Sequence, residues 1–240
     1  MTDFKYVGSE LDLFAAVVNW KTYWSQIIRP FIRGDVLEAG AGIGSNTPFL
    51  DRTDIRRWVC LEPDPELIAL LSARLAQSAT RRRYETVTAT LEQLDPLQKF
   101  DTIVYIDVLE HLENDREELS LAAARLMPGG RIVVLSPAHQ ELFTPFDEAI
   151  GHFRRYNKQM IRDISPDGLR LERLMYLDTV GLLASLANRL LLRQSMPTKD
   201  QLQLWDRWMI PTSRVIDKIL AYSIGKSIIA VWQRENGWLR

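Results

Sequence analysis

The apolar positions of this chain follow two alternating patterns. Longer stretches repeat apolar residues every three or four positions, which predicts amphipathic helices over 11–33, from about 45 onward, over 66–77 and over 113–127. Short apolar runs predict buried strands at 35–40, 57–62, 84–88, 100–106 and 131–136. Strands that alternate with helices predict an α/β fold, a doubly wound and mostly parallel sheet with helices on both faces.

The last third of the chain departs from this alternation. Two further strands are predicted at 169–176 and 227–233, and an amphipathic insertion, 178–222, lies between them. The insertion combines Leu and Trp at helical spacing with a mildly basic set of charges, six Lys and Arg against four Asp. Three interpretations stay open: a lid over the substrate, the contact face of a homodimer, or a helix pair on a membrane surface.

Composition excludes several classes of protein. The 240 residues are 46% hydrophobic and 25% charged, which is ordinary for a globular chain. Thirty Lys and Arg against 31 Asp and Glu leave a net charge of -1, so we expect no nucleic-acid partner. The single Cys60 excludes an internal disulfide and a thiolate zinc cluster. The longest apolar stretch, 179–192, is too short to span a membrane, so we expect a cytoplasmic protein without a transmembrane segment.

Topology predicts where a ligand binds. On a doubly wound sheet, ligands bind at the carboxyl ends of the strands, where the strand order reverses. The segments 38–46, 62–66, 89–92, 107–111 and 136–139 should therefore border one cleft. The first of them holds glycines at 40, 42 and 44, which let the backbone turn sharply and approach a ligand. Glu62 ends the next strand, and its two carboxylate oxygens can accept both hydroxyls of a ribose.

Four motifs carry a resemblance to a known family. The run Val36-Leu-Glu-Ala-Gly-Ala-Gly-Ile-Gly44 resembles the first motif of class I S-adenosylmethionine-dependent methyltransferases, and Cys60-Leu-Glu-Pro-Asp64 resembles their second. Ile106-Asp-Val-Leu-Glu-His-Leu112 and Leu126-Met-Pro-Gly-Gly-Arg131 are similar to two later motifs. The resemblance extends to a bacterial branch known as methyltransferase types 11 and 12. It implies a seven-stranded, Rossmann-like sheet whose last strand is antiparallel.

The resemblance also implies a domain organisation and a cofactor. We expect a single methyltransferase domain over 1–240, with an N-terminal helical lid (1–33), a cofactor-binding core (34–137) and the insertion 178–222 near the substrate. The implied cofactor is S-adenosyl-L-methionine. A nicotinamide-dependent oxidoreductase is the rival enzyme class, but neither Tyr105 nor Tyr156 has the Lys four residues later that such chemistry usually needs.

The implied cofactor contacts come from Glu38, Gly40, Ala41, Gly42, Glu62, Pro63, Thr90, Leu91, Glu92, Asp107 and Tyr23. Gly40 and Gly42 would admit the methionine moiety and the ribose. Glu38 would orient the loop or reach the ammonium group of the cofactor. Glu62 would hold the ribose hydroxyls, and Pro63 would pack near the adenine.

The remaining contacts depart partly from the family pattern. Leu91 and Glu92 would flank the adenine, but Thr90 stands where many relatives have an Asp that accepts the adenine amino proton. Asp107 would lie beside the methionine moiety. Tyr23 would donate to the methionine carboxylate, unless its ring only covers the sheet.

Candidate catalytic residues are His152, His111, Asp107 and Tyr156, because methyl transfer to a protonated acceptor needs a base. His111 has an alternative interpretation as a packed histidine that bonds a backbone carbonyl. Some relatives hold a divalent metal with an acid-x-x-Glu-His arrangement, which Asp107, Glu110, His111 and His152 could imitate. Our expectation is that no metal is bound.

The expected function is methyl transfer to a small-molecule acceptor, such as a secondary metabolite or a lipid-like compound. The alternative is a catalytically silent cofactor-binding or regulatory partner protein. We expect Tyr23, His139, His152 and Tyr156, together with part of 178–210, to line one mostly apolar acceptor cavity. Arg154 or Arg155 is expected in an internal ion pair.

Overall fold

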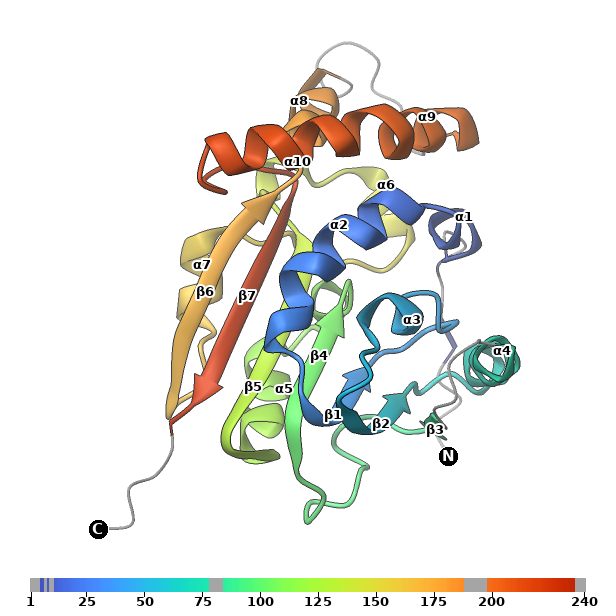
Figure 1. Ribbon diagram of the computed structural model, residues 1–240, viewed down its shortest axis with the longest axis vertical. Helices are drawn as coiled ribbons and strands as arrows, with labels where there is room; N and C mark the ends of the chain where they lie inside the picture. The colour runs from blue at the N-terminus through green and yellow to red at the C-terminus, as the bar shows by residue number, and fades with distance from the viewer. Residues whose placement is uncertain (1–4, 7, 9–10, 78–83, 188–197, 236–240) are drawn as a thin grey trace.

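Seven strands make one sheet in the described part of the chain, in the order β3-β2-β1-β4-β5-β7-β6 (Figure 1). This computed structural model describes residues 5, 6, 8, 11–77, 84–187 and 198–235. The strands are β1 (Gly34–Ala39), β2 (Ile55–Leu61), β3 (Glu85–Val87), β4 (Phe100–Ile106), β5 (Leu126–Pro137), β6 (Leu169–Leu177) and β7 (Ser227–Arg234). Only β7 runs in the direction opposite to the other six strands, which confirms the predicted α/β fold and its antiparallel last strand.

The helices of the described residues lie on both faces of this sheet and across one end of it (Figure 1). They are α1 (Leu11–Ala15), α2 (Val18–Ile28), α3 (Thr47–Leu50), α4 (Pro65–Ala76), α5 (Asp115–Ala124), α6 (Pro145–Ala149), α7 (Lys158–Asp163), α8 (Thr179–Ala187), α9 (Lys199–Leu204) and α10 (Ile210–Ile219). A π-helical turn, Trp205–Met209, joins α9 to α10. None of the described helices is long and apolar enough to cross a membrane.

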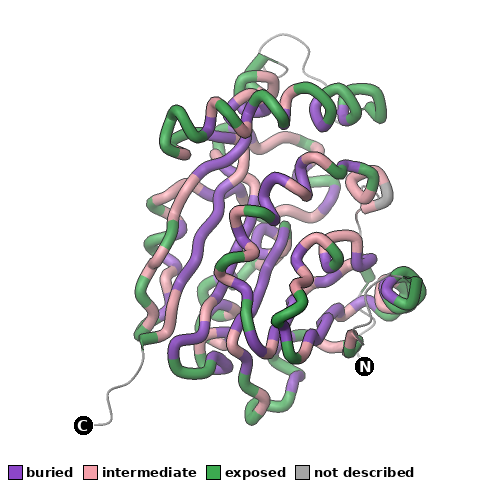
Figure 2. Tube along the Cα trace, viewed as in Figure 1, coloured by how far each residue is buried: buried purple, intermediate pink, exposed green. Residues whose placement is uncertain are grey.

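Strand residues alternate between two apolar cores because successive side chains of a strand point to opposite faces. Val36 and Val104 pack with α2 and α4 in one core. Their neighbours Leu37 and Ile103 pack with α5 and α7 in the other. Figure 2 shows the central strands buried along nearly their whole length, as expected for a sheet covered on both faces.

Two predicted element boundaries are wrong, and each for a tertiary reason. The helix predicted over 113–127 ends at Ala124, because Leu126 pairs with Phe100 and already begins β5. The helix predicted over 11–33 is interrupted at Val17, whose backbone is extended. The carboxylate of Asp206 then accepts the N–H groups of Val18, Asn19 and Trp20 and starts α2.

The insertion lies over the end of the sheet where the parallel strands finish (Figure 1). The carboxylate of Asp217 on α10 accepts the Asp178 and Thr179 N–H groups at 2.7 and 3.0 Å, at the start of α8. It also accepts the Tyr23 hydroxyl of α2 at 2.7 Å. The insertion is therefore bonded to α2, and Asp178, Asp206 and Asp217 of the insertion are buried.

Candidate functional site: a cleft at the reversal of strand order

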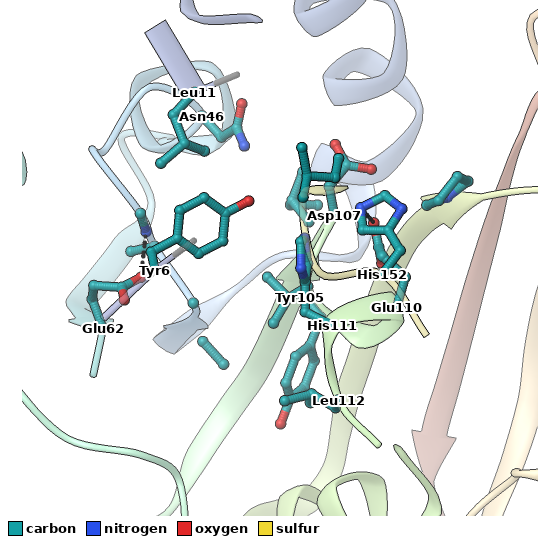
Figure 3. Close-up of a pocket in the computed structure, with 18 of the residues that line it drawn as sticks. Tyr6, Leu11, Asn46, Glu62, Tyr105, Asp107, Glu110, His111, Leu112 and His152 are labelled. Carbon is teal, nitrogen blue, oxygen red and sulfur yellow. Dashed lines mark hydrogen bonds and ion pairs between the residues drawn. The ribbon is translucent and has the colours of Figure 1, made fainter. Parts of the chain in front are cut away.

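A cleft of about 690 Å³ opens at the carboxyl ends of β1 and β4, between which the strand order reverses. All five segments predicted to border one cleft contribute to its lining. The predicted site residues that line it are Gly40, Ala41, Gly42, Glu62, Pro63, Thr90, Leu91, Glu92, Asp107, His111 and His152. Figure 3 shows Glu62 on one side of the cleft and His111 and His152 on the other.

Two glycines of the loop after β1 have different surroundings. Gly40, with φ +63°, leaves room for a neighbour, because a Cβ there would lie 2.7 Å from a methyl group of Val108. Gly42, with φ +54°, faces open space, since a Cβ there would meet no atom within 4 Å. The open space beside the Gly42 backbone is therefore where a ligand can approach closely.

Glu62 connects this loop to the end of β2. Its two carboxylate oxygens accept the Gly42 N–H at 2.8 Å and the Asp64 N–H at 3.0 Å. Burial raises the pKa of Glu62, and these two hydrogen bonds oppose the shift. Because each carboxylate oxygen can accept more than one hydrogen bond, Glu62 retains acceptor capacity toward the cleft.

Glu38 lies behind the loop rather than in the cleft lining. Its Oε2 accepts the Thr47 hydroxyl at 2.8 Å and the Trp58 indole N–H at 3.0 Å, and the whole side chain is buried. Burial raises the pKa of Glu38 to about 7. Of its two predicted roles, these contacts fit the one that orients the loop.

The loop after β3 also lines the cleft. Leu91 is buried there, while Thr90 and Glu92 are exposed. The buried Arg125 donates to the Leu91 and Leu94 carbonyls at 2.8 Å, which fixes the backbone of this loop. The Thr90 N–H is occupied by the Gln93 side chain at 2.9 Å.

His152 and Asp147 form a bonded pair on the opposite side of the cleft. The Asp147 carboxylate accepts from His152 Nδ1 at 3.0 Å and from two nitrogens of Arg155, each at 2.8 Å. Burial disfavours the charge, but these hydrogen bonds hold the pKa of Asp147 well below its usual range. An ionised carboxylate can only accept, so His152 Nδ1 carries the proton and Nε2 is the basic nitrogen.

His111 and Glu110 lie next to this pair. The His111 and His152 rings pack edge to face, with their centroids 4.5 Å apart, and His152 Nε2 is 4.0 Å from Glu110 Oε1. Burial and the neighbouring His152 lower the pKa of His111 to about 4, so its ring is neutral at pH 7. Burial, followed by the charge of Asp107, raises the pKa of Glu110 well above its usual range, which favours the neutral acid.

Asp107 follows β4 with a φ of +53°, a conformation that non-glycine residues seldom adopt. Its N–H donates to the Leu135 carbonyl at 2.9 Å, which anchors the residue to the end of β5. The exposed side chain lines the cleft between Glu62 and the histidines (Figure 3).

Three residues predicted to line the cavity do not line it. Tyr23 is turned away because its buried hydroxyl donates to Asp217. Tyr156 is fully buried, and its hydroxyl is bonded to Asp115 at 2.8 Å and to the Leu109 carbonyl. The His139 ring is bonded to the Gly225 carbonyl at 3.0 Å. Each of these polar groups is hydrogen-bonded inside the fold, so none of them reaches the cleft.

Other expectations about this region are confirmed. Arg155 is locked in an internal ion pair with Asp147, and Arg154 is paired with Asp115 at 2.7 Å. Part of the segment 178–210 reaches the cleft through Trp205, whose indole N–H donates to Asp178 at 2.7 Å.

Sequence reasoning missed several residues of the cleft lining. Tyr6 lies across the cleft from Asp107 (Figure 3), and its backbone N–H donates to Asp64 at 2.7 Å. The buried Lys21 donates to the Ser45 hydroxyl at 2.9 Å and so connects α2 to the glycine loop. A lysine on the apolar face of a predicted helix was a signal for Lys21. No local sequence pattern predicted that Tyr6 would line the cleft.

One group of side chains in the described residues has the geometry to hold a metal ion. Glu110, His111 and His152 each offer one ligand atom, and these atoms lie within 4.8 Å of one another. Asp107, which the metal alternative had included, is not part of this group.

Comparison with known proteins finds a match for part of the chain. The family model of a methyltransferase domain matches residues 37–132. A tRNA U34 carboxymethyltransferase of Haemophilus ducreyi is 25% identical over 131 residues, which are 52% of this chain and 41% of that enzyme. The chain therefore spans less than half the length of this curated relative.

Two solved structures share the fold over most of both chains. An S-adenosylmethionine-dependent methyltransferase of Clostridium acetobutylicum has a TM-score of 0.59 and 10% identity, covering 94% of this chain and 95% of that one. The N-methyltransferase NodS of Bradyrhizobium japonicum, in complex with S-adenosyl-L-homocysteine, has a TM-score of 0.54 and 14% identity over 90% of this chain and 85% of NodS.

Residues 37–132, which hold the glycine loop and Glu62, thus match a methyltransferase domain, and the seven-stranded fold is shared with solved S-adenosylmethionine-dependent methyltransferases. The residues present fit the cofactor of this class, S-adenosylmethionine. The open space beside Gly42 and the spare acceptor capacity of Glu62 suit a ribose with two hydroxyl donors.

Proposed function

We propose that this protein transfers the methyl group of S-adenosylmethionine to a small-molecule acceptor, with His152 as the general base. One observation carries the proposal. A single cleft connects Gly42 and Glu62, on the cofactor side, to the bonded pair of His152 and Asp147 on the other side.

The cofactor supplies an electrophilic methyl carbon bound to a sulfonium. The protein's own contribution is to hold the acceptor in line and to remove its proton where it carries one. His152 Nε2 accepts that proton. Asp147 is a positioning residue, because its ionised carboxylate keeps the proton on Nδ1 and stabilises the imidazolium that forms. Arg155 in turn fixes Asp147 through two hydrogen bonds.

A small acceptor is favoured over tRNA by the size and charge of the site. The cleft of about 690 Å³ lies within the range of small-molecule sites, roughly 300–1,000 Å³. A chain with a net charge of -1 lacks the cationic excess typical of nucleic-acid binding. The tRNA enzyme among the relatives makes a nucleic-acid acceptor the alternative that an acceptor screen must include.

The test is the variant His152→Ala. We expect turnover to fall about 100- to 10,000-fold, the usual contribution of a general base, while the affinity for S-adenosylhomocysteine stays within about twofold. The matched control is His139→Gln, because His139 lies outside the cleft lining. Full turnover in His152→Ala would remove the base from the proposal. Cofactor binding without turnover of any acceptor would instead favour the catalytically silent alternative.

A metal-assisted reaction is the second candidate, because Glu110, His111 and His152 have ligand atoms within 4.8 Å of one another. We expect dialysis against a chelator to leave turnover unchanged, since the neutral acid that burial favours at Glu110 is a poor ligand. If the chelator abolished turnover and magnesium or manganese restored it, this expectation would be wrong, and Glu110, His111 and His152 would be the metal ligands.

A further inference from the structure

Lys226 lines the cleft from the segment that leads into β7. Its backbone is held on both sides, because the Ala138 N–H donates to the Lys226 carbonyl at 2.8 Å and the Lys226 N–H donates to the Asp178 carbonyl at 3.1 Å. The side chain lines the cleft, and its Nζ lies 5.1 Å from the ring centroid of Trp205.

The ring of Trp205 is itself fixed. Its indole N–H donates to the Asp178 carboxylate at 2.7 Å, and the ring is almost fully buried at the edge of the cleft. Lys226 and Trp205 therefore form a preorganised surface with one cationic atom beside one aromatic ring, an arrangement that holds the ammonium by a cation–π contact.

Two other cationic side chains line the cleft, Lys21 and Arg155, and both have bonded partners. The Lys21 ammonium is bonded to Ser45, and the Arg155 guanidinium is paired with Asp147. Lys226 has neither an ion pair nor a hydrogen bond from its ammonium to any residue that the structure describes.

The charges of three carboxylates, Asp178, Asp147 and Asp107, act on Lys226 and raise its pKa. Asp178 accepts from Trp205, Ser213 and Gly181, and Asp147 accepts from His152 and Arg155. Burial nevertheless lowers the pKa of Lys226, the direction expected of a desolvated ammonium that has no carboxylate at ion-pair distance among the described residues. A bound anion would relieve this cost.

We propose that the methyl acceptor is a small organic acid whose carboxylate or phosphate binds the Lys226 ammonium while its apolar part packs against Trp205. This rests on the proposed function, since it names the substrate class of the same cleft. The anionic group is either a carboxylate or a phosphate monoester, and probes that carry one or the other distinguish the two.

The experiment measures binding to the full chain saturated with S-adenosylhomocysteine, by titration calorimetry at pH 7.5. The probes are matched pairs that differ in one charge: 4-hydroxybenzoate with 4-hydroxybenzamide, and hexanoate with hexanamide. Phenyl phosphate tests the phosphate source. We expect the acid of at least one pair, or phenyl phosphate, to bind at least about tenfold more tightly than the uncharged amides.

Variants assign the preference to Lys226. Lys226→Met should lose about 10- to 100-fold in affinity for the preferred acid and leave the amide unchanged, whereas Lys226→Arg should retain part of the preference. The control Lys218→Met, on the exposed face of α10, should behave as the unaltered protein. The affinity for S-adenosylhomocysteine should be equal in all four proteins.

Equal binding of all acids and amides by the unaltered protein would overturn the inference, and so would a preference that survives in Lys226→Met. If Lys226→Met does not fold, the acid–amide comparison in the unaltered protein and in Lys226→Arg decides alone. A failure of S-adenosylhomocysteine to bind would instead overturn the proposed function, and this inference with it.

Discussion

Glu62 acts on the glycine loop and faces the cleft with the same carboxylate. Its oxygens fix the N–H groups of Gly42 and Asp64. The Asp64 side chain in turn caps α4 by accepting the Glu66 N–H at 2.7 Å. The sequence Glu62-Pro-Asp-Pro65 thus ends a strand, places an acceptor at the cleft and starts a helix within four residues.

The first prediction concerns this residue. Glu62→Gln should weaken S-adenosylhomocysteine binding by about 1–3 kcal/mol, because an amide loses one acceptor oxygen and the charge that strengthens both hydrogen bonds. Titration calorimetry measures the change. Glu66→Gln is the matched control, since its side chain is exposed on the first turn of α4. Unchanged affinity in Glu62→Gln would place the ribose elsewhere.

At the scale of elements, α2 depends on a residue far away in sequence. Val17 offers no side chain that can cap the helix, and the Asp206 carboxylate supplies the cap from the π-helical turn of the insertion. The same helix carries Lys21 to the glycine loop and the Tyr23 hydroxyl to Asp217. The insertion and the glycine loop are therefore connected through α2.

The second prediction tests the cap that Asp206 supplies. Asp206→Ala should lower the free energy of unfolding by about 1–2 kcal/mol, the upper range for loss of a helix cap, because three N–H groups lose their acceptor. Urea denaturation measures the change. Asp167→Ala, at an exposed position before β6, should change stability by less than about 0.5 kcal/mol. Equal stability of both variants would contradict the role of Asp206 as a cap.

At the scale of the whole molecule, buried ionisable groups make stability depend on pH in opposite directions. The pKa of His111 falls to about 4 in the folded state, against 6.5 for an ordinary histidine. Between these values the unfolded chain binds one more proton at this residue, so its contribution to stability is lost as the pH falls. Glu38, with a pKa raised to about 7, contributes stability that is lost as the pH rises from 4.5.

The third prediction isolates His111 from the rest of the molecule. Between pH 6.5 and 4, the unfolding free energy of the unaltered protein should fall more steeply than that of His111→Gln, by up to about 1.4 kcal/mol per pH unit. Glu38 is present in both proteins, so its opposite contribution cancels in the comparison. Parallel pH profiles from urea titrations would show that His111 is not held neutral by its surroundings.

The parts that the sequence by itself determined are those encoded by neighbouring residues. The alternation of apolar runs and helical spacings was enough for the seven strands and their α/β class. The glycines of 40–44, and Glu62 at the end of the next strand, located the cleft because parallel strands end at one edge. Such patterns are local in the chain, and the rules of sheet topology carry them into space.

Tertiary structure alone decided which polar side chains face the cleft. Tyr23, His139 and Tyr156 had the chemistry expected of site residues, but each is bonded to a group distant in sequence. Lys226 and Trp205 reach the cleft only because β7 and the insertion fold back over the sheet. A hydrogen-bonding group takes whichever partner the packed fold brings near it, and composition and spacing do not specify that partner.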